Sequence, residues 1–206
     1  MALLLPRMYP ITDVRLSGMS HAAQVERLAA GGATLIQLRE KTASPRDFCD
    51  AALDAIAVAR RLGVRVIIND RVDIAIAVEA DGVHLGQDDL PPERARLLLG
   101  DDRIIGYSSH SLEQALEADS APVDYIAFGP IFSTATKANP DAAVGLEGLR
   151  GIRARISKPL VAIGGITLES ARRVIEAGAD SVAIVSDLYT TGDIANRCRE
   201  LVRLLG

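Results

Sequence analysis

The chain has 206 residues, of which 49% are hydrophobic and 24% are charged, as is typical of a globular domain. This composition excludes an extended disordered protein, because enough apolar surface is available to offset the entropy that is lost on ordering. A formal net charge of −4 disfavours binding to nucleic acid through a broad basic surface. It leaves room for a small basic pocket that takes an anionic substrate.

Neither Cys49 nor Cys198 lies in a CxxC pair or near a histidine at metal-ligand spacing, so we expect no zinc site and no disulfide framework. The apolar start of the chain lacks a charged region and a cleavage signal. No run approaches the roughly 18 apolar residues that span a bilayer. We therefore expect a cytoplasmic protein without a membrane segment, and the sequence leaves its oligomeric state open.

Short apolar runs recur along the whole chain, and each is followed by a turn and by a segment typical of a helix. The eight runs occupy residues 8–11, 33–38, 64–68, 82–85, 103–107, 125–128, 160–163 and 181–185. Helical patterns include residues 21–32, 46–63, 146–156, 168–178 and 192–205, and several end near a glycine, as helix C-termini prefer. The runs are apolar throughout, which indicates strands that are buried on both faces.

The alternation of strands and helices predicts parallel strands joined by right-handed crossovers. Eight such units close into a (β/α)8 barrel, the TIM barrel, and we expect a single α/β domain over residues 1–206. An open, doubly wound parallel sheet is the alternative. The one long loop expected is 133–145, and a long loop in a compact chain is typically functional.

In such a barrel the chemistry lies at the carboxyl ends of the strands. Nearly every predicted strand here ends in polar or glycine residues that a core does not require, so we expect them to meet at one rim. These residues are Gln37, Arg39, Glu40, Lys41, Asn69, Asp70, Arg71, His84, Asp88, Asp89, Ser108, His110, Ser133, Thr134, Thr136, Lys137, Gly164, Gly165 and Ser186.

The rim predicts two kinds of binding site. Arg39, Lys41 and Lys137 supply cations for an anion, and backbone N–H groups at 164–165 and 186 suit a phosphate after the last two strands. The carboxylates of Asp70 and Asp89 come from neighbouring strand ends. Magnesium is typically held by one or two carboxylates, with substrate phosphates and water completing its shell. Together these features point to a diphosphate–Mg²⁺ substrate.

Structural roles stay open for several of these residues when each is taken alone. The charged run 39–41 is also typical of a solvated face. Asp70 and Ser108 are common N-cap residues, and residues 88–89 precede two prolines, as turn residues do. The glycine pair 164–165 also suits a tight turn without a ligand.

The three histidines are interpreted as structural residues. His84 lies within an apolar strand, which favours a hydrogen-bonded core residue over a catalytic base. His21 and His110 are expected at the surface or at helix starts. Cys49 and Cys198 lie on helical patterns and are expected to serve packing.

With these residues in hand, the chain resembles the thiamine phosphate synthase family over nearly its whole length. One departure is Ser133, which stands where the family's loop carries a proline. The matching motifs, in the family's order, are YPITD (9–13), QLREK (37–41), NDRVDIA (69–75), DGVHLGQDDL (81–90), IGYSSHS (105–111), DYIAFGPIFSTATK (124–137), AIGGIT (162–167) and GADSVAIVS (178–186).

The resemblance implies a transferase of thiamine biosynthesis that couples 4-amino-2-methyl-5-(diphosphooxymethyl)pyrimidine with 4-methyl-5-(2-phosphooxyethyl)thiazole. The implied products are thiamine phosphate and pyrophosphate, formed by Mg²⁺-assisted dissociative loss of diphosphate. The resemblance also implies Asp70 and Asp89 as metal ligands, and Arg39, Lys41, Ser108 and Lys137 as catalytic residues. The implied substrate-binding residues are Gln37, Leu38, Arg39, Glu40, Lys41, Asn69, Ser108, Thr134, Ala135, Thr136, Lys137, Gly165 (with Gly164 as its alternative), Val185 and Ser186.

Two other functions stay open. A related thiazole tautomerase on the same barrel requires an acid–base residue, such as a histidine, but no diphosphate or metal site. A catalytically silent barrel binds phosphates without forming product. The Asn69–Asp70 pair, Asp89 and the segment 134–137 favour the synthase, because neither alternative needs this combination.

Overall fold

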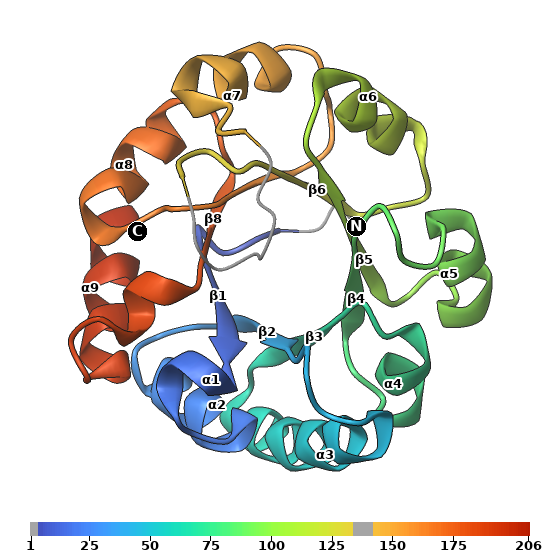
Figure 1. Cartoon of the computed structure of the whole chain (residues 1–206), viewed down its shortest axis with the longest axis vertical. Helices are drawn as coiled ribbons and strands as arrows, with labels where there is room; N and C mark the ends of the chain where they lie inside the picture. The colour runs from blue at the N-terminus through green and yellow to red at the C-terminus, as the bar shows by residue number, and fades with distance from the viewer. Residues whose placement is uncertain (1–3, 134–141) are drawn as a thin grey trace.

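Eight parallel strands form a closed barrel, and their order around the ring is their order in the chain (Figure 1). This computed structural model describes residues 4–133 and 142–206. The strands are β1 (Met8–Asp13), β2 (Leu35–Arg39), β3 (Arg65–Asn69), β4 (Gly82–Leu85), β5 (Ile104–Ser109), β6 (Tyr125–Phe128), β7 (Leu160–Ile163) and β8 (Ser181–Ile184). Because β8 also pairs with β1, the predicted barrel is confirmed and the open doubly wound sheet is wrong.

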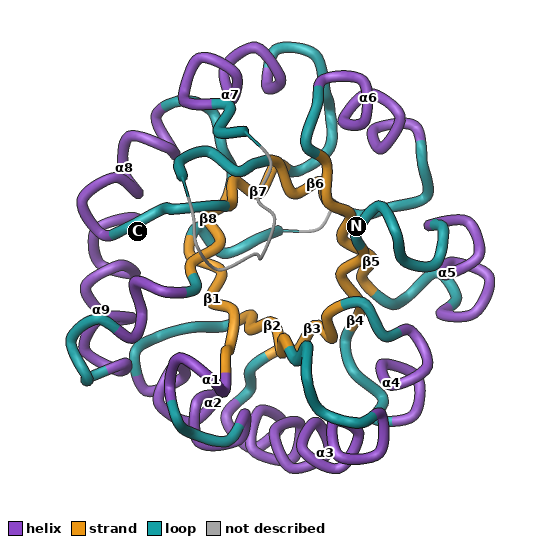
Figure 2. Tube along the Cα trace, in the orientation of Figure 1, coloured by secondary structure: helices purple, strands orange, loops and turns teal. Residues whose placement is uncertain are grey.

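The helices surround the strands as an outer ring (Figure 2). Each crossover returns the chain over the outside of the barrel, as parallel pairing requires. The helical elements are α1 (Val14–Ser17), α2 (His21–Ala30), α3 (Pro45–Leu62), α4 (Val72–Ala77), α5 (Pro92–Leu99), α6 (Leu112–Ser120), α7 (Gly145–Arg153), α8 (Leu168–Glu176), the 3₁₀ turn η1 (Ser186–Tyr189) and α9 (Ile194–Leu205).

Local sequence explains where α3 begins and ends. The Ser44 hydroxyl accepts a hydrogen bond from the Asp47 N–H, and Pro45 occupies the first turn, where it removes no intrahelical bond. Gly63 ends the helix at φ 68°, a left-handed conformation that glycine adopts without strain. The C-terminal glycine signal therefore predicted this boundary correctly.

Two hydrophobic layers account for the continuously apolar strands. Side chains such as Leu35 and Ile67 fill the barrel interior, whereas Ile36 and Leu38 alternate with them and pack under the helices. All four are fully buried. Alternation along a strand sends successive side chains to opposite faces, and both faces are covered here, so no polar alternation is visible in the sequence.

Several strands run further than their apolar stretches. β1 continues to Asp13, which pairs with Arg39, and β5 continues to Ser109, which pairs with Phe128. The expected strands ended two residues earlier in both cases. They were predicted from apolar runs, and the last residues of these strands carry polar side chains although their backbone hydrogen bonds continue. The polar ends of these strands therefore belong to the rigid barrel rather than to loops.

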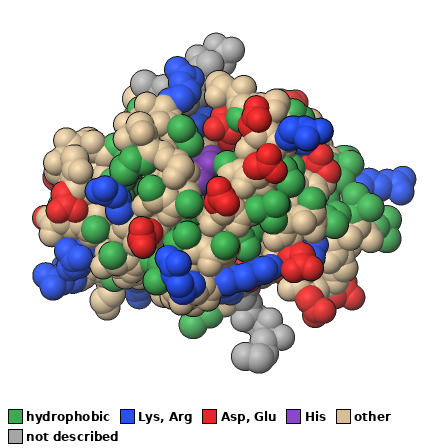
Figure 3. Space-filling model, turned by 90° about the horizontal axis from the view of Figure 1, so that it is seen from below, with side chains coloured by type: hydrophobic (Ala, Val, Ile, Leu, Met, Phe, Trp, Pro, Cys, Tyr) green, Lys and Arg blue, Asp and Glu red, His purple; other side chains and the backbone are tan. Residues whose placement is uncertain are grey.

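The molecular surface carries mixed charges. On the face drawn in Figure 3, acidic and basic side chains alternate without one sign dominating, as the small net charge suggests. Within residues 4–133 and 142–206, no helix has the length and apolar character needed to cross a membrane. Both cysteines are free thiols, and Cys198 is fully buried, consistent with a packing role.

Candidate active site

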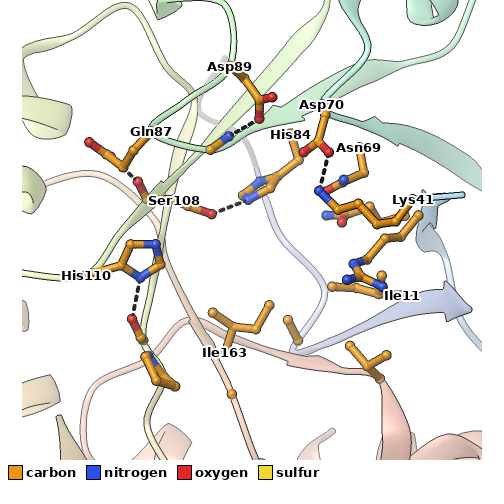
Figure 4. Close-up of a pocket in the computed structure, with 18 of the residues that line it drawn as sticks. Ile11, Lys41, Asn69, Asp70, His84, Gln87, Asp89, Ser108, His110 and Ile163 are labelled. Atoms are coloured by element: carbon orange, nitrogen blue, oxygen red, sulfur yellow. Dashed lines mark hydrogen bonds and ion pairs between the residues drawn. The ribbon is translucent and has the colours of Figure 1, made fainter. Parts of the chain in front are cut away.

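A cavity of about 500 Å³ opens at the carboxyl ends of the strands and extends into the barrel. Figure 4 shows its polar side chains converging from separate strand ends, with Ile11 and Ile163 on the side away from the acidic residues. Of the residues expected at the rim or implied at the site, those that line the cavity are Gln37, Arg39, Lys41, Asn69, Asp70, His84, Asp88, Asp89, Ser108, His110, Gly164, Gly165, Val185 and Ser186.

Two carboxylates lie at one side of this cavity, on the loops that follow β3 and β4. Asp70 holds a left-handed backbone conformation with φ 62°, which is uncommon for a residue with a side chain. Its carboxylate accepts a hydrogen bond from Lys41 Nζ (Figure 4). Asp70 does not cap α4, whose N-cap is Arg71 and has no side-chain hydrogen bond. The N-cap alternative for Asp70 is therefore wrong.

Asp89 is held beside Asp70 by its own backbone turn. Its Oδ2 accepts a hydrogen bond from the Gly86 N–H at 2.7 Å. Burial raises the pKa of the Asp89 carboxyl, the Gly86 bond opposes that rise, and the negative charge of Asp70 adds to it. Two acidic groups thus face each other with only partial neutralisation by Lys41.

This pair fits a hard divalent cation. Oxygen ligands and an uncompensated negative charge are what Mg²⁺ prefers, and it commonly uses only one or two protein carboxylates. Within the described ranges, no group of three or more His, Cys, Asp or Glu side chains could hold a metal. A cation at this pair would therefore take its remaining ligands from a bound molecule or water.

The cationic side of the cavity comes from the end of β2. Arg39 Nη1 lies 3.0 Å from Asp13 Oδ2, so a buried carboxylate on β1 orients the guanidinium. The Lys41 side chain is about half exposed at 49% and leans on Asp70. An exposed pair of that kind contributes little stability, which leaves the ammonium available to an anion.

Asn69 presents an unused donor at the end of β3. Its side chain is buried, and Nδ2 has no hydrogen-bond partner among the described residues. Burying an amide without a partner costs free energy. Because Asn69 lines the cavity, an anionic oxygen bound there would satisfy this group.

Ser108 lies within β5, and the helix that follows is capped instead by Ser111. The N-cap alternative for Ser108 is therefore wrong. Its Oγ lies 2.8 Å from His84 Nε2, and His84 Nδ1 lies 2.9 Å from the Tyr125 hydroxyl. Burial lowers the pKa of His84 to about 4. The prediction that His84 is a hydrogen-bonded core residue is confirmed, although the histidine also lines the cavity.

The glycine pair after β7 requires glycine at both positions. Gly164 has φ 102° and Gly165 has φ 63°. A Cβ at Gly164 would lie 2.4 Å from Pro130 Cβ, and one at Gly165 would lie 2.5 Å from the Ser133 carbonyl oxygen. The turn therefore needs glycine for its own geometry, and it also brings backbone to the cavity beside Val185.

Two residues expected to bind substrate do not line the cavity. Leu38 is fully buried in the outer layer under the helices. The Glu40 Oε1 accepts backbone N–H bonds from residues 41, 42 and 43. Burial opposes ionisation of Glu40, but these bonds and the Thr42 hydroxyl hold its pKa below the ordinary value. Glu40 therefore shapes the loop that carries Lys41.

Four expected residues, Thr134, Ala135, Thr136 and Lys137, lie outside the described residues. Their assignment to the site stays a prediction.

The other two histidines make specific hydrogen bonds. His21 begins α2, as predicted, but it is buried at 2% exposure and its Nδ1 lies 2.8 Å from Thr12 Oγ1. His110 lies between β5 and α6, where Nδ1 contacts the Gly129 carbonyl oxygen at 2.7 Å and the ring lines the cavity. Both lie at a helix start, which was one of the two expected positions, and the surface alternative is wrong for His21. Gln87, which follows the fourth predicted strand, also lines the cavity, and so does Gln114, which was not expected there.

The comparisons with known proteins agree on one family. The family described as thiamine monophosphate synthase matches residues 8–188. The chain is 48% identical to a thiamine-phosphate synthase of Chloroflexus aurantiacus, over 97% of this chain and 92% of that protein. It is also 48% identical to a thiamine-phosphate synthase of Koribacter versatilis, over 98% and 97% respectively.

Solved structures place the fold in the same group. A thiamine phosphate pyrophosphorylase from Pyrococcus furiosus superposes with a TM-score of 0.88 at 38% identity, over 97% of this chain and 95% of that one. A 3-hexulose-6-phosphate synthase shares only the fold, with a TM-score of 0.70 at 17% identity over 97% of this chain and all of that one. The chain therefore belongs to the thiamine monophosphate synthase family of enzymes.

Proposed function

We propose that this chain is a thiamine-phosphate synthase that joins a pyrimidine carrying a diphosphooxymethyl group to a thiazole carrying a phosphooxyethyl group, releasing pyrophosphate. The observation that carries the proposal is the pairing of two carboxylates with neighbouring cations in one cavity. Asp70 and Asp89 stand beside Lys41, and Arg39 and Asn69 complete the same side. A bound diphosphate with its divalent cation complements this set of groups in charge and donor type.

Most of the activation free energy of this reaction comes from the departure of the diphosphate leaving group. The C–O bond to diphosphate breaks at a methylene whose positive charge an electron-rich aminopyrimidine delocalises. Stabilising the negative charge that develops on the diphosphate is then the main catalytic task. Arg39, Lys41 and the Asn69 amide would donate to that charge, with Lys137 as a further cation. Asp70 and Asp89 would hold Mg²⁺, which would supply Lewis-acid stabilisation of that charge.

The second substrate needs positioning more than activation. The thiazole nitrogen is already nucleophilic, so holding it near the methylene supplies most of what the protein must add. Backbone at Gly165, Val185 and Ser186 would take the thiazole phosphate, together with Thr134 and Thr136. Barrels commonly bind phosphate after their last two strands, next to a short extra helix, and η1 begins at Ser186.

A tautomerase is disfavoured by the state of His84. Both of its ring nitrogens face hydrogen-bond partners, and burial lowers its pKa to about 4. A general base works best with a pKa near the operating pH, so His84 suits proton abstraction poorly. A silent phosphate-binding barrel has no use for paired, mutually repelling carboxylates, which cost stability without a cation.

A two-substrate assay tests the proposal. Thiamine phosphate and pyrophosphate should form only when both substrates and Mg²⁺ are present, and a chelator should stop the reaction. Turnover of the thiazole phosphate alone in chelator would favour the tautomerase. Protection against thermal unfolding by the ligands without any product, measured by mass spectrometry, would favour the silent binder.

A further inference from the structure

A chain of buried hydrogen bonds crosses the barrel beneath the cavity and joins Gln37 on β2 to Ser108 on β5. Gln37 Nε2 donates to the Tyr9 hydroxyl at 3.1 Å, and the Tyr9 and Tyr125 hydroxyls lie 3.0 Å apart. The Tyr125 hydroxyl lies 2.9 Å from His84 Nδ1, and His84 Nε2 lies 2.8 Å from Ser108 Oγ. Figure 4 shows the last of these contacts.

The two tyrosines in the middle of this hydrogen-bond chain do not line the cavity. Tyr9 and Tyr125 are 1% and 0% exposed and belong to the apolar layer inside the barrel, and neither lines the cavity. Both ends of the chain, Gln37 and Ser108, do line it. A change in either tyrosine can therefore reach a ligand only through its neighbours.

The absence of a side chain at Gly106 makes room for the contact between His84 and Tyr125. A Cβ at Gly106 would lie 2.0 Å from the Tyr125 ring and 2.5 Å from His84 Nδ1. The His84 and Tyr125 rings stack at 5.5 Å between centroids with 19° between their planes. A larger residue at position 106 of β5 would therefore displace His84 and Tyr125 from this contact.

The donor and acceptor groups allow only one direction of proton donation along this series of hydrogen bonds. The Gln37 Nε2 group only donates, so the Tyr9 oxygen accepts from it. The remaining described partner of the Tyr9 hydroxyl is Tyr125, so the Tyr9 proton points to Tyr125. The reverse order would leave the Tyr9 O–H without an acceptor in an apolar layer, which is costly.

The direction then continues to Ser108. Tyr125 accepts from Tyr9 and so donates its own proton to His84 Nδ1, which must be unprotonated. A neutral imidazole with bare Nδ1 carries its proton on Nε2. His84 therefore donates to Ser108 Oγ, and the Ser108 proton is left to point into the cavity.

We propose that Tyr9, Tyr125 and His84 are positioning residues that hold Ser108 as a hydrogen-bond donor aimed at the leaving diphosphate. In this series of hydrogen bonds, one N–H of the Gln37 side-chain amide donates to Tyr9. The other N–H of that amide can donate to the ring nitrogen of an aminopyrimidine, and its carbonyl oxygen can accept from the amino group. The target of Ser108 rests on the proposed function, whereas the direction of the chain does not.

The tautomer of His84 tests the direction without any assay of activity. The chain has three histidines, so 15N-labelled histidine gives a spectrum that variants of the other two can assign. At neutral pH, long-range 1H–15N correlations should show His84 protonated on Nε2 and bare on Nδ1. A His84 protonated on Nδ1 would overturn the proposed direction.

Tyr125→Phe and Tyr9→Phe test the positioning role. Losing the Tyr125 hydroxyl removes the donor that keeps His84 Nδ1 bare and frees the Ser108 proton to turn back to His84. The Nε2–H population should then fall and kcat should drop about tenfold, as a loss of about 1.4 kcal/mol would produce, with a smaller change in KM. In Tyr9→Phe the Tyr125 proton keeps His84 Nδ1 as its described acceptor, so the tautomer should persist and the fall in kcat should be smaller. Tyr107→Phe is the matched control, because Tyr107 packs against the outer layer of the same barrel. It should leave kcat and the tautomer unchanged.

Unchanged kcat and an unchanged tautomer in folded Tyr125→Phe protein would overturn the positioning role, and so would a shift of the His84 proton to Nδ1 in folded Tyr9→Phe protein. Two variants are used because one of them can fail to fold, which circular dichroism would reveal. A wild-type protein that makes no thiamine phosphate, but whose His84 keeps its proton on Nε2, would remove the proposed function and still support the direction of the chain.

Discussion

At the scale of single residues, the site is governed by which polar groups are left incompletely satisfied. Asn69 buries an amide nitrogen without a partner, and Asp89 has a raised pKa because it is buried near Asp70. Folding alone does not favour either arrangement. An anion bound at Asn69 together with a cation bound at Asp89 would make both arrangements favourable, so these two residues support the proposed site more strongly than the exposed charges do.

The Asp89 carboxylate is the residue whose loss should be most damaging. Asp89→Asn should lower kcat by about 100-fold or more, as losing a major charge-stabilising contact does, and should weaken the dependence on Mg²⁺. Asp101→Asn removes an exposed carboxylate from the segment before β5, outside the cavity, and should alter kcat by less than about threefold, because an exposed charge away from the site contributes little. Steady-state kinetics over a Mg²⁺ titration would measure both. Equal losses in the two variants would contradict the role given to Asp89.

At the scale of elements, the loop after β2 shows how a charged side chain can organise its neighbours. Glu40 was expected to bind substrate, yet its carboxylate holds the backbone of residues 41–43. Adjacent residues in a strand end point in different directions, so a run of charges in the sequence does not reveal which of them reaches the cavity. Glu40 instead fixes the loop from which Lys41 projects.

This role predicts a pH-dependent effect on stability. The folded pKa of Glu40 lies below its ordinary value, so its charge stabilises the fold above that ordinary value, and the contribution is lost as pH falls through the lowered pKa. Glu40→Gln should lower the free energy of unfolding by about 1 kcal/mol at pH 7. Urea denaturation at decreasing pH should show the gap closing.

Glu26→Gln is the control for that series. Glu26 is 65% exposed and lies 3.7 Å from Arg61 in a surface ion pair, which contributes little. It should stay close to wild type at every pH. A gap between wild type and Glu40→Gln that does not depend on pH would contradict the assigned role of the Glu40 charge.

At the scale of the whole molecule, closure of the barrel is what brings distant segments to one cavity. β1 pairs with both β2 and β8, so Ile11 and Ala183 line the same wall although they lie far apart in the chain. The interior layer below the cavity is apolar apart from the hydrogen-bond chain. That layer supports the cavity floor and the tyrosines within it.

Substitution of Ile67, which is fully buried inside the barrel, tests how strongly the fold depends on this interior layer. Ile67→Ala should lower the free energy of unfolding by about 2–5 kcal/mol, because it removes buried surface and leaves a cavity. Leu97→Ala, on α5 at 75% exposure, should change it by less than about 0.5 kcal/mol. Thermal unfolding of the two variants compares them, and equal shifts would contradict the assignment of the interior core.

The sequence by itself determined the eight strands, their parallel order and the rim on which the polar residues gather, because apolar runs and turn glycines are local signals. It also determined the family, through motifs spread over most of the chain. Only the tertiary structure decided that Asp70 meets Asp89 and Lys41, that Glu40 and Leu38 turn away, and that His21 is buried. Those outcomes depend on strand register and on which face of each strand a side chain occupies, and closure of the barrel sets both.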